Sequence, residues 1–186
     1  AAGPRPERTL LFAAWTGEER GILGSFHYAA NPLYPNETMV ASLALDTLQT
    51  AGPSRDVILI GQGQSDLEDL MTRMAASQGR TVTPDGQPQR GLFYRADHFP
   101  FARQGVPVLL LMALGGGADL VNGGREAGDR WVSEFTARCY HQTCDEWSSD
   151  WDLRGAAQDV ALAYSIGMEL ANSRAWPNWS QDSEFR

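Results

Sequence analysis

The chain has 186 residues, of which 42% are hydrophobic and 20% are charged, proportions typical of one globular domain. Its formal net charge of −8 argues against a nucleic-acid partner, because no cluster of basic residues offsets it. No apolar run approaches the roughly 20 residues that a membrane-spanning helix needs, so a membrane partner is not expected either.

The distribution of residue types along the sequence predicts one folded domain with a short segment on each side. Residues 1–8 contain two prolines and lack both an initiator methionine and an apolar signal core. We therefore interpret them as a linker or as the cut end of a longer chain. The folded domain is expected at residues 9–175, and residues 176–186 are expected to form a polar tail.

Short apolar runs predict the strands of a sheet. Each run is nearly continuous rather than alternating, which is typical of strands that are covered on both faces. The runs are residues 10–15, 39–45, 57–60 and 106–112. Apolar stripes at helical spacing predict helices around residues 67–74 and 157–168, and residues 81–90 are expected to form a turn-rich loop. This order predicts an α/β fold, a layered α/β/α sandwich around a mostly parallel or mixed sheet.

The tetrapeptide Thr16-Gly17-Glu18-Glu19 follows directly after the first apolar run. By itself it is typical of a helix start, in which Thr16 is the N-cap and Glu19 completes a capping box. The alternative is chemical, because carboxylates at the carboxyl end of a buried strand lie where open α/β sheets place their active sites. One carboxylate can then ligate a cation while the other takes a proton from the attacking water.

Further polar residues follow other apolar runs. Asp46 directly follows a buried run and, taken alone, favours a turn. His141 lies beside Tyr140 in a polar loop, so it is a poor core residue and a candidate ligand. This loop is flanked by Cys139 and Cys144, which predict with equal weight a disulfide or a pair of free thiols. A disulfide would indicate an oxidising compartment.

Taken in order, these motifs resemble the co-catalytic dizinc exopeptidases, metallopeptidase family 28, which includes bacterial leucyl-type aminopeptidases. The resemblance extends from Arg8 to about Leu170, and the run LFAAWTGEERGILGS at residues 11–25 is its most specific part. It implies an aminopeptidase-like α/β/α sandwich that lacks its first strands. Residues 9–175 would then be a partial catalytic domain.

The resemblance also implies roles for individual residues. The first Glu of the pair is the family's general base, which implies this role for Glu18. The second is a metal ligand, which implies that Glu19 and His141 bind one metal ion and Asp46 binds the other. The Tyr before the His stabilises the oxyanion in the family, which implies this role for Tyr140.

The stretch Ala96-Asp97-His98 resembles the family's Ser-Asp-His stretch near the substrate pocket, with Ala96 in place of Ser. Asp97 and His98 are therefore expected to lie near the pocket and not to be primary ligands. His27 lies about 12 Å beyond Glu19 along a helix at 1.5 Å per residue, so we expect a surface or interface residue.

Two ligands of the family have no counterpart here. An early His and a bridging Asp come from a segment before the Glu-Glu pair, where this chain has only residues 1–8. Without them neither half of the site has three protein ligands, the number that catalytic zinc usually has. Loss of a sheet edge would also leave a strand and an apolar face uncovered, so we expect a homo-oligomer.

The resemblance implies a metal-dependent hydrolase that removes N-terminal residues from peptides through a zinc-activated water. One or two zinc ions are expected, although manganese and cobalt accept the same donors. The first alternative is a phosphatase-like phosphoester hydrolase, because paired metals serve both reactions. The second is a non-catalytic fragment that acts as a binding or assembly module. The expected partner is a peptide or small-molecule substrate, and the expected location is the periplasm or the exterior, although the chain carries no signal segment.

Overall fold

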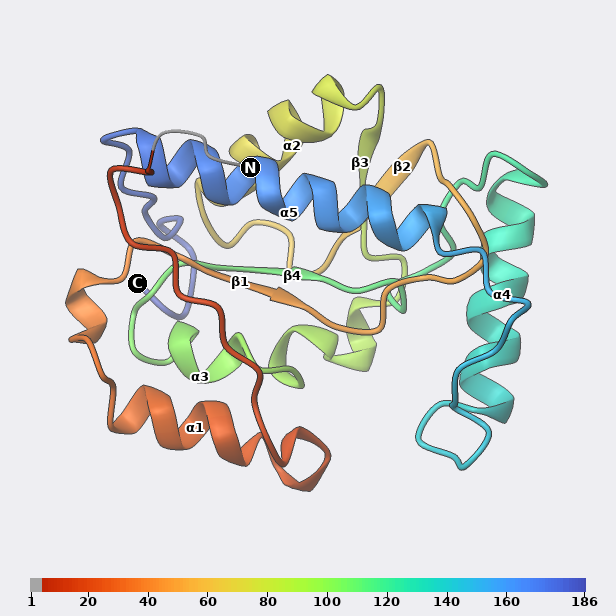
Figure 1. Cartoon of the computed structure of the whole chain (residues 1–186), viewed down its shortest axis with the longest axis horizontal. Helices are drawn as coiled ribbons and strands as arrows, with labels where there is room; N and C mark the ends of the chain where they lie inside the picture. The colour runs from red at the N-terminus through yellow and green to blue at the C-terminus, as the bar shows by residue number, and fades with distance from the viewer. Residues whose placement is uncertain (1–4) are drawn as a thin grey trace.

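The computed structural model describes residues 5–186 (Figure 1). The strands are β1 (Ser42–Leu45), β2 (Asp56–Leu59), β3 (Thr81–Pro84) and β4 (Val108–Leu111). The helices are α1 (Leu23–Ala30), α2 (Leu67–Ser77), α3 (Phe99–Ala102), α4 (Gly124–Arg138) and α5 (Arg154–Asn172). Short 3₁₀ turns cover Glu18–Arg20, Asn36–Thr38, Pro88–Arg90 and Leu92–Tyr94. None of the helices in this part of the chain is both long and apolar enough to cross a membrane.

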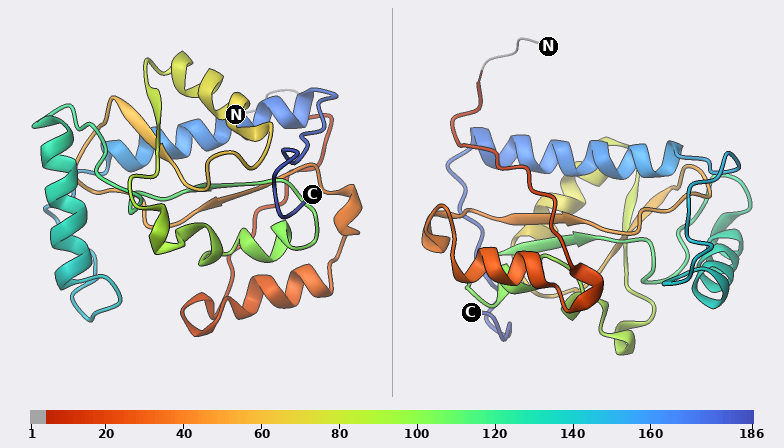
Figure 2. Two further views of the ribbon diagram at one scale, coloured as in Figure 1. Left: turned by 180° about the vertical axis from the view of Figure 1, so that it is seen from behind. Right: turned by 60° about the horizontal axis from the view of Figure 1, so that its bottom comes forward.

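The strands run parallel, β1 beside β4 and β2 beside β3, and helices cover both of their faces. Side chains of β2 and β4 alternate between two apolar clusters. Ile58 and Leu110 face one cluster, with residues of α1 and α3, whereas Val57 and Leu109 face the other, with residues of α2 and α5. Figures 1 and 2 show these helix pairs on opposite sides of the strands. This arrangement confirms the predicted α/β class and its layered form.

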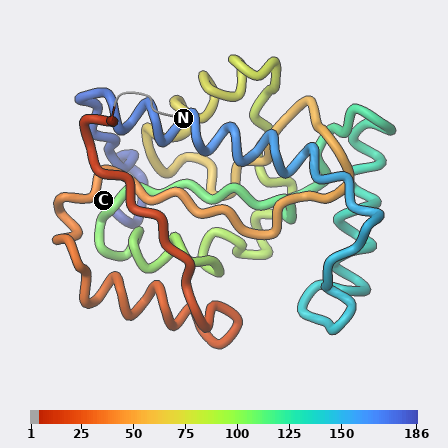
Figure 3. The backbone as a smooth tube through the Cα atoms, in the orientation of Figure 1, coloured from red at the N-terminus to blue at the C-terminus, as the bar shows by residue number. Residues whose placement is uncertain are grey.

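The predicted strand at residues 10–15 is wrong. These residues make no backbone hydrogen bond to the rest of the described chain, and the segment passes from the α5 side to the α1 side as an extended strip (Figure 3). Leu11 and Phe12 are 54% and 89% exposed. An apolar run becomes a strand only when a neighbour supplies ladder hydrogen bonds, and the described residues supply none here. The expected oligomer stays a prediction.

Strand β1 is shorter and less buried than the apolar run at residues 39–45 predicts. Its side chains are half-buried and Leu45 is exposed, whereas β2 and β4 are fully buried. The reason is its position, because β1 pairs with β4 on one edge and no strand among residues 5–186 pairs with its other edge. The candidate ligand Asp46 therefore follows an edge strand that is less buried than its partner β4.

The loop expected at residues 81–90 begins with a strand instead. The Thr81 N–H donates to the Arg55 carbonyl at 3.0 Å, and the ladder continues from there between β2 and β3. The β-branched residues Thr81, Val82 and Thr83 suit this pairing. Prolines and a glycine later in the segment then produce the expected turns.

The residues expected as a polar tail return to the folded core. The Trp179 indole N–H donates to the Gly105 carbonyl at 2.8 Å, just after α3. Trp179 and Phe185 both pack on the apolar cluster between the strands and α3. Figure 2 shows this last segment running from the end of α5 past the strand ends. Aromatic area, rather than the polar residues around it, decides the placement of the segment.

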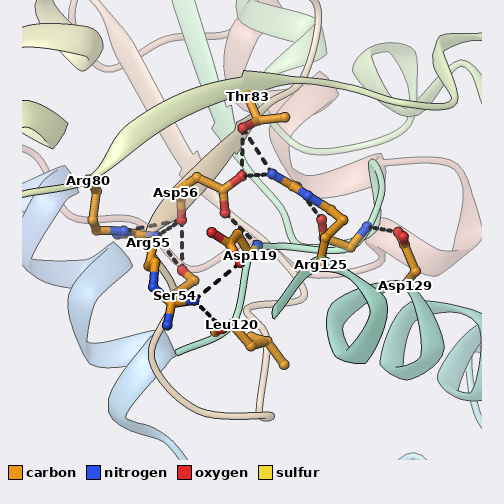
Figure 4. Close-up of polar contacts among 10 residues, drawn as sticks. Ser54, Arg55, Asp56, Arg80, Thr83, Asp119, Leu120, Arg125 and Asp129 are labelled. Carbon is orange, nitrogen blue, oxygen red and sulfur yellow. Dashed lines mark hydrogen bonds and ion pairs between the residues drawn. The ribbon is translucent and has the colours of Figure 1, made fainter. Parts of the chain in front are cut away.

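A buried carboxylate joins the strands to α4 (Figure 4). Asp56 at the start of β2 accepts hydrogen bonds from the Thr83 hydroxyl at 2.5 Å, from the Asp119 N–H at 2.7 Å and from the Arg125 guanidinium at 2.5 Å. Arg125 belongs to the first turn of α4. Because a buried charge is tolerated only when it is paired and hydrogen-bonded, these contacts fix the position of α4 against β2 and β3.

We predict that Asp56→Ala lowers the free energy of unfolding by about 3 kcal/mol, because it removes the buried acceptor shared by the Thr83 hydroxyl, the Asp119 N–H and the Arg125 guanidinium. The matched control is Asp119→Ala, which keeps the Asp119 N–H and removes only a partly exposed ion pair with Arg55 at 3.2 Å. That control should cost less than about 1 kcal/mol. Urea unfolding at neutral pH measures both values, and equal losses would contradict the role given to Asp56.

Candidate metal centre

A tight elbow presents Glu18 and Glu19 between the extended strip and α1. Gly17 has φ 71°, in the left-handed region that favours glycine, and the Glu18–Arg20 turn follows it. The Gly24 N–H donates to the Thr16 carbonyl at 2.9 Å, and a Cβ on Gly24 would lie 2.6 Å from that oxygen. The helix thus begins at Leu23 without a side-chain cap, and the capping-box interpretation of Thr16 and Glu19 is wrong.

Asp46 directly follows β1, at the carboxyl end of the parallel pair. Its N–H donates to the Leu111 carbonyl at 3.0 Å, so β4 fixes its backbone. The Thr47 hydroxyl donates to one carboxylate oxygen at 2.8 Å. Thr47 has φ 39°, which turns the chain sharply after the strand. The expected turn and the expected site residue therefore coincide.

A small loop after α4 carries Tyr140 and His141. Cys139 and Cys144 form a disulfide with a Cα–Cα distance of 5.1 Å, so the structure takes the oxidised alternative. His141 has φ 61°, an uncommon backbone conformation for a residue with a side chain. The Tyr140 and His141 rings stack with centroids 3.8 Å apart, and Tyr140 also packs on Phe135 of α4.

These three segments meet at one cavity of about 240 Å³. Its walls include Glu18 and Glu19 from the elbow, Asp46 from the end of β1, and Tyr140 and His141 from the disulfide loop. The His141 Nε2 lies 3.0 Å from the Glu19 Oε2. Residues that are as much as 123 positions apart in the sequence (Glu18 and His141) therefore share one site.

Two carboxylates of this cavity, Glu18 and Asp46, have a raised pKa. Burial raises the pKa of Glu18 to about 7, and the nearby carboxylates of Asp46, Glu19 and Asp97 add to the rise. Burial also raises the pKa of Asp46, although the hydrogen bond from Thr47 opposes the shift. A cluster of acidic side chains with raised pKa values favours the binding of protons or cations.

The donor chemistry of the cavity suits zinc, while the number of donors falls short. Glu19 and His141 place a carboxylate and an imidazole side by side, and both are ordinary zinc ligands. Within residues 5–186, no three His, Cys, Asp or Glu side chains lie close enough together to hold one ion. Asp46 lines the cavity but does not complete a three-ligand set with the other two. The described residues therefore fit an incomplete zinc centre.

Asp97 and His98 do not line the cavity. Asp97 accepts a hydrogen bond from the buried Ser25 hydroxyl at 2.5 Å, which links α1 to the turn before α3. His98 is fully buried, with its ring edge-to-face on Phe93 at 4.9 Å. The prediction that His98 lies near the substrate pocket is wrong, because its ring is packed inside the apolar core. His27 is exposed, as expected.

Four cavity residues escaped the sequence analysis: Ile22, Thr47, Tyr94 and Arg95. The charge of Arg95 opposes the rise in the pKa of Glu18 and of Tyr140. A signal for two of them existed, since Tyr94 and Arg95 directly precede the Asp97 motif. Ile22 has φ 58° and belongs to the elbow, which only the three-dimensional structure reveals.

Comparisons with known proteins identify the family of the chain. The Peptidase family M28 model matches residues 1–165. The chain is 27% identical over 169 residues to leupeptin-inactivating enzyme 1 of Streptomyces exfoliatus, which covers 89% of this chain and 36% of that protein. It is 30% identical over 154 residues to aminopeptidase Y of Saccharomyces cerevisiae, which covers 77% of this chain and 25% of that protein. The match thus spans about a third of the length of the first relative and a quarter of the length of the second.

The burial of His98 predicts loss of stability in acid. Burial lowers the pKa of His98 from 6.5 to about 3, so between these values only the unfolded chain binds the proton. The free energy of unfolding should therefore fall by about 1.4 kcal/mol per pH unit below pH 6.5 through this residue. Above pH 6.5 the contribution vanishes, because His98 is neutral in both states.

Unfolding of wild type and His98→Gln by urea, between pH 7 and pH 4, measures this slope. The variant should lose less stability per pH unit than wild type, whatever its stability at pH 7. His98→Phe serves as a second variant, and His27→Gln, at an exposed position, should keep the wild-type slope. Parallel curves for wild type and both His98 variants would contradict the assignment.

Proposed function

The chain belongs to peptidase family M28, and from this premise we propose that it is the zinc-dependent part of an aminopeptidase that removes N-terminal residues from peptides. The observation that supports the proposal most is the meeting of Glu18, Glu19, Asp46, Tyr140 and His141 at one cavity. A peptidase family favours peptides over the phosphoester alternative. Retention of acid, base and ligand residues at one place speaks against a purely structural module.

Glu19 and His141 would hold the zinc ion, with Asp46 facing it from the end of β1. The bound ion would polarise the scissile carbonyl and lower the pKa of an attacking water. The acidic walls of the cavity also suit the free α-ammonium group of a peptide, because that group carries the opposite charge. This charge arrangement favours a chain end over the neutral interior of a peptide.

Glu18 would act as the general base. It lies next to Glu19 in the elbow without being paired to His141, so its carboxylate is free to take a proton from water and to pass it to the leaving amine. The Tyr140 hydroxyl would donate a hydrogen bond to the oxyanion. Burial raises the pKa of Tyr140, which keeps this hydroxyl protonated at neutral pH.

The division of roles predicts opposite effects for two variants. Glu18→Gln should lower kcat for leucine p-nitroanilide at least about 100-fold, because the amide cannot accept the proton. Its zinc content after dialysis should stay near that of wild type. His141→Ala should lose zinc as well as activity, whereas His27→Ala, at an exposed position, should change neither.

Hydrolysis rates and zinc contents of these variants test whether Glu18 is the general base and His141 a zinc ligand. Near-normal turnover by Glu18→Gln would refute the mechanism. Hydrolysis of p-nitrophenyl phosphate in place of the anilide would favour the phosphoester alternative. Zinc-loaded wild type that hydrolyses neither compound would favour the non-catalytic alternative.

The number of donors predicts the stoichiometry of zinc. Because Glu19 and His141 give one pair and Asp46 stands alone, the chain should bind at most one zinc ion tightly. Calorimetric titration of chelator-stripped protein with zinc measures this number. Two tight sites per chain would mean that further residues join the centre, and the ligand assignment would then have to change.

A further inference from the structure

The C-terminal segment, residues 177–186, is attached to the fold at several points. The Ser180 N–H donates to the Gln64 carbonyl at 2.8 Å, and the Asp66 N–H donates to the Asn178 carbonyl at 3.0 Å. The Trp179 indole is bonded to Gly105. These contacts come from the loop before α2 and the turn after α3, so the segment crosses from one helical layer to the other.

The end of this segment contacts Tyr94. The Tyr94 hydroxyl donates to the Glu184 Oε1 at 2.6 Å, a length typical of a hydrogen bond to a charged acceptor. Phe185 packs between Phe93 and Phe99, with ring centroids 5.7 and 6.1 Å away, and lies 6.5 Å from the Tyr94 ring. Tyr94 is thus held at its hydroxyl and beside its ring by neighbouring residues of one segment.

Tyr94 is also a wall of the candidate metal centre. Together with Ile22 and Tyr140 it gives the cavity an apolar part, next to the acidic side chains. Tyr94 remains 45% exposed: its ring contacts Phe93 and Phe99, with centroids 5.6 Å away, and its hydroxyl is bonded to Glu184. A half-exposed ring binds a ligand more tightly when other contacts already restrict its rotation, because immobilising a free side chain on binding costs free energy.

We propose that Glu184 and Phe185 are positioning residues that hold Tyr94 as the apolar wall of the substrate site, and that the C-terminal segment thereby selects peptides whose first residue is large and apolar. This inference rests on the proposed function. Glu184 and Phe185 do not line the cavity, so they act through Tyr94 and not by touching the substrate.

The test compares p-nitroanilides of phenylalanine and alanine. Glu184→Ala and Phe185→Ala should raise KM for the phenylalanine compound about tenfold, the scale of discrimination by an apolar pocket, while kcat changes less than about twofold. KM for the alanine compound should stay within about twofold, because a methyl side chain does not reach the wall. Asp182→Ala, an exposed carboxylate on the same segment, is the matched control and should behave as wild type.

Two further variants separate positioning from general structure. Tyr94→Phe keeps the ring but removes the hydroxyl, so it should reproduce Glu184→Ala, and the double variant should add no further loss. Phe185→Tyr keeps an aromatic ring and should restore most of the selectivity lost in Phe185→Ala. Thermal unfolding of each variant verifies that the fold persists.

A binding measurement distinguishes this inference from the proposed function. In a Glu18→Gln background, which prevents turnover, calorimetry with zinc present compares phenylalanine amide with alanine amide. A preference for phenylalanine amide that disappears in Glu184→Ala supports the inference even when wild type hydrolyses no anilide. The inference is overturned if the Glu18→Gln protein, with Glu184 and Phe185 unchanged, binds both amides equally. It is also overturned if the Glu184 and Phe185 variants lose kcat equally on both anilides.

Discussion

The position of one wall of the site, the loop that carries Tyr140 and His141, depends on one buried carboxylate. Asp56 is removed from water at the start of β2, where an unpaired charge would be very costly. Its contacts to Thr83, Arg125 and the Asp119 N–H bring β3, α4 and the loop before α4 to fixed places around it. Because the disulfide loop follows α4, the place of His141 in the cavity depends on an ion pair at the other end of that helix.

The acidic cavity imposes a second constraint, which opposes stability. Burial and mutual repulsion raise the pKa of Glu18 and of Asp46, so the folded chain holds carboxylates that would ionise more easily in water. The elbow around Gly17 and the ladder at β4 keep these groups together in spite of their repulsion. A cation or an ammonium group in the cavity would relieve the same repulsion. Residues that weaken the unliganded fold are therefore the ones that strengthen ligand binding.

The sequence predicts what depends on local pattern and misses what depends on distant partners. Continuous apolar runs identify β2 and β4, because both are covered on two faces. The run at residues 10–15 has the same pattern, but a strand also needs a neighbour that periodicity cannot supply. Helix α4 escapes prediction because its sequence holds two glycines and many charged residues, and the helix buries only Gly128 and Val132. His98 resembles a site residue in its motif, yet only tertiary packing reveals that its ring belongs to the core.

The disulfide between Cys139 and Cys144 determines the stage at which the loop of the site becomes ordered. Forming the disulfide restricts Tyr140 and His141 before any ligand arrives, so the loss of conformational entropy belongs to oxidation and not to binding. With the thiols reduced, the same loop would have to be ordered by the ligand itself, at the expense of affinity. The strength of the centre is then partly a property of the compartment in which the chain folds, even though neither Cys139 nor Cys144 lines the cavity.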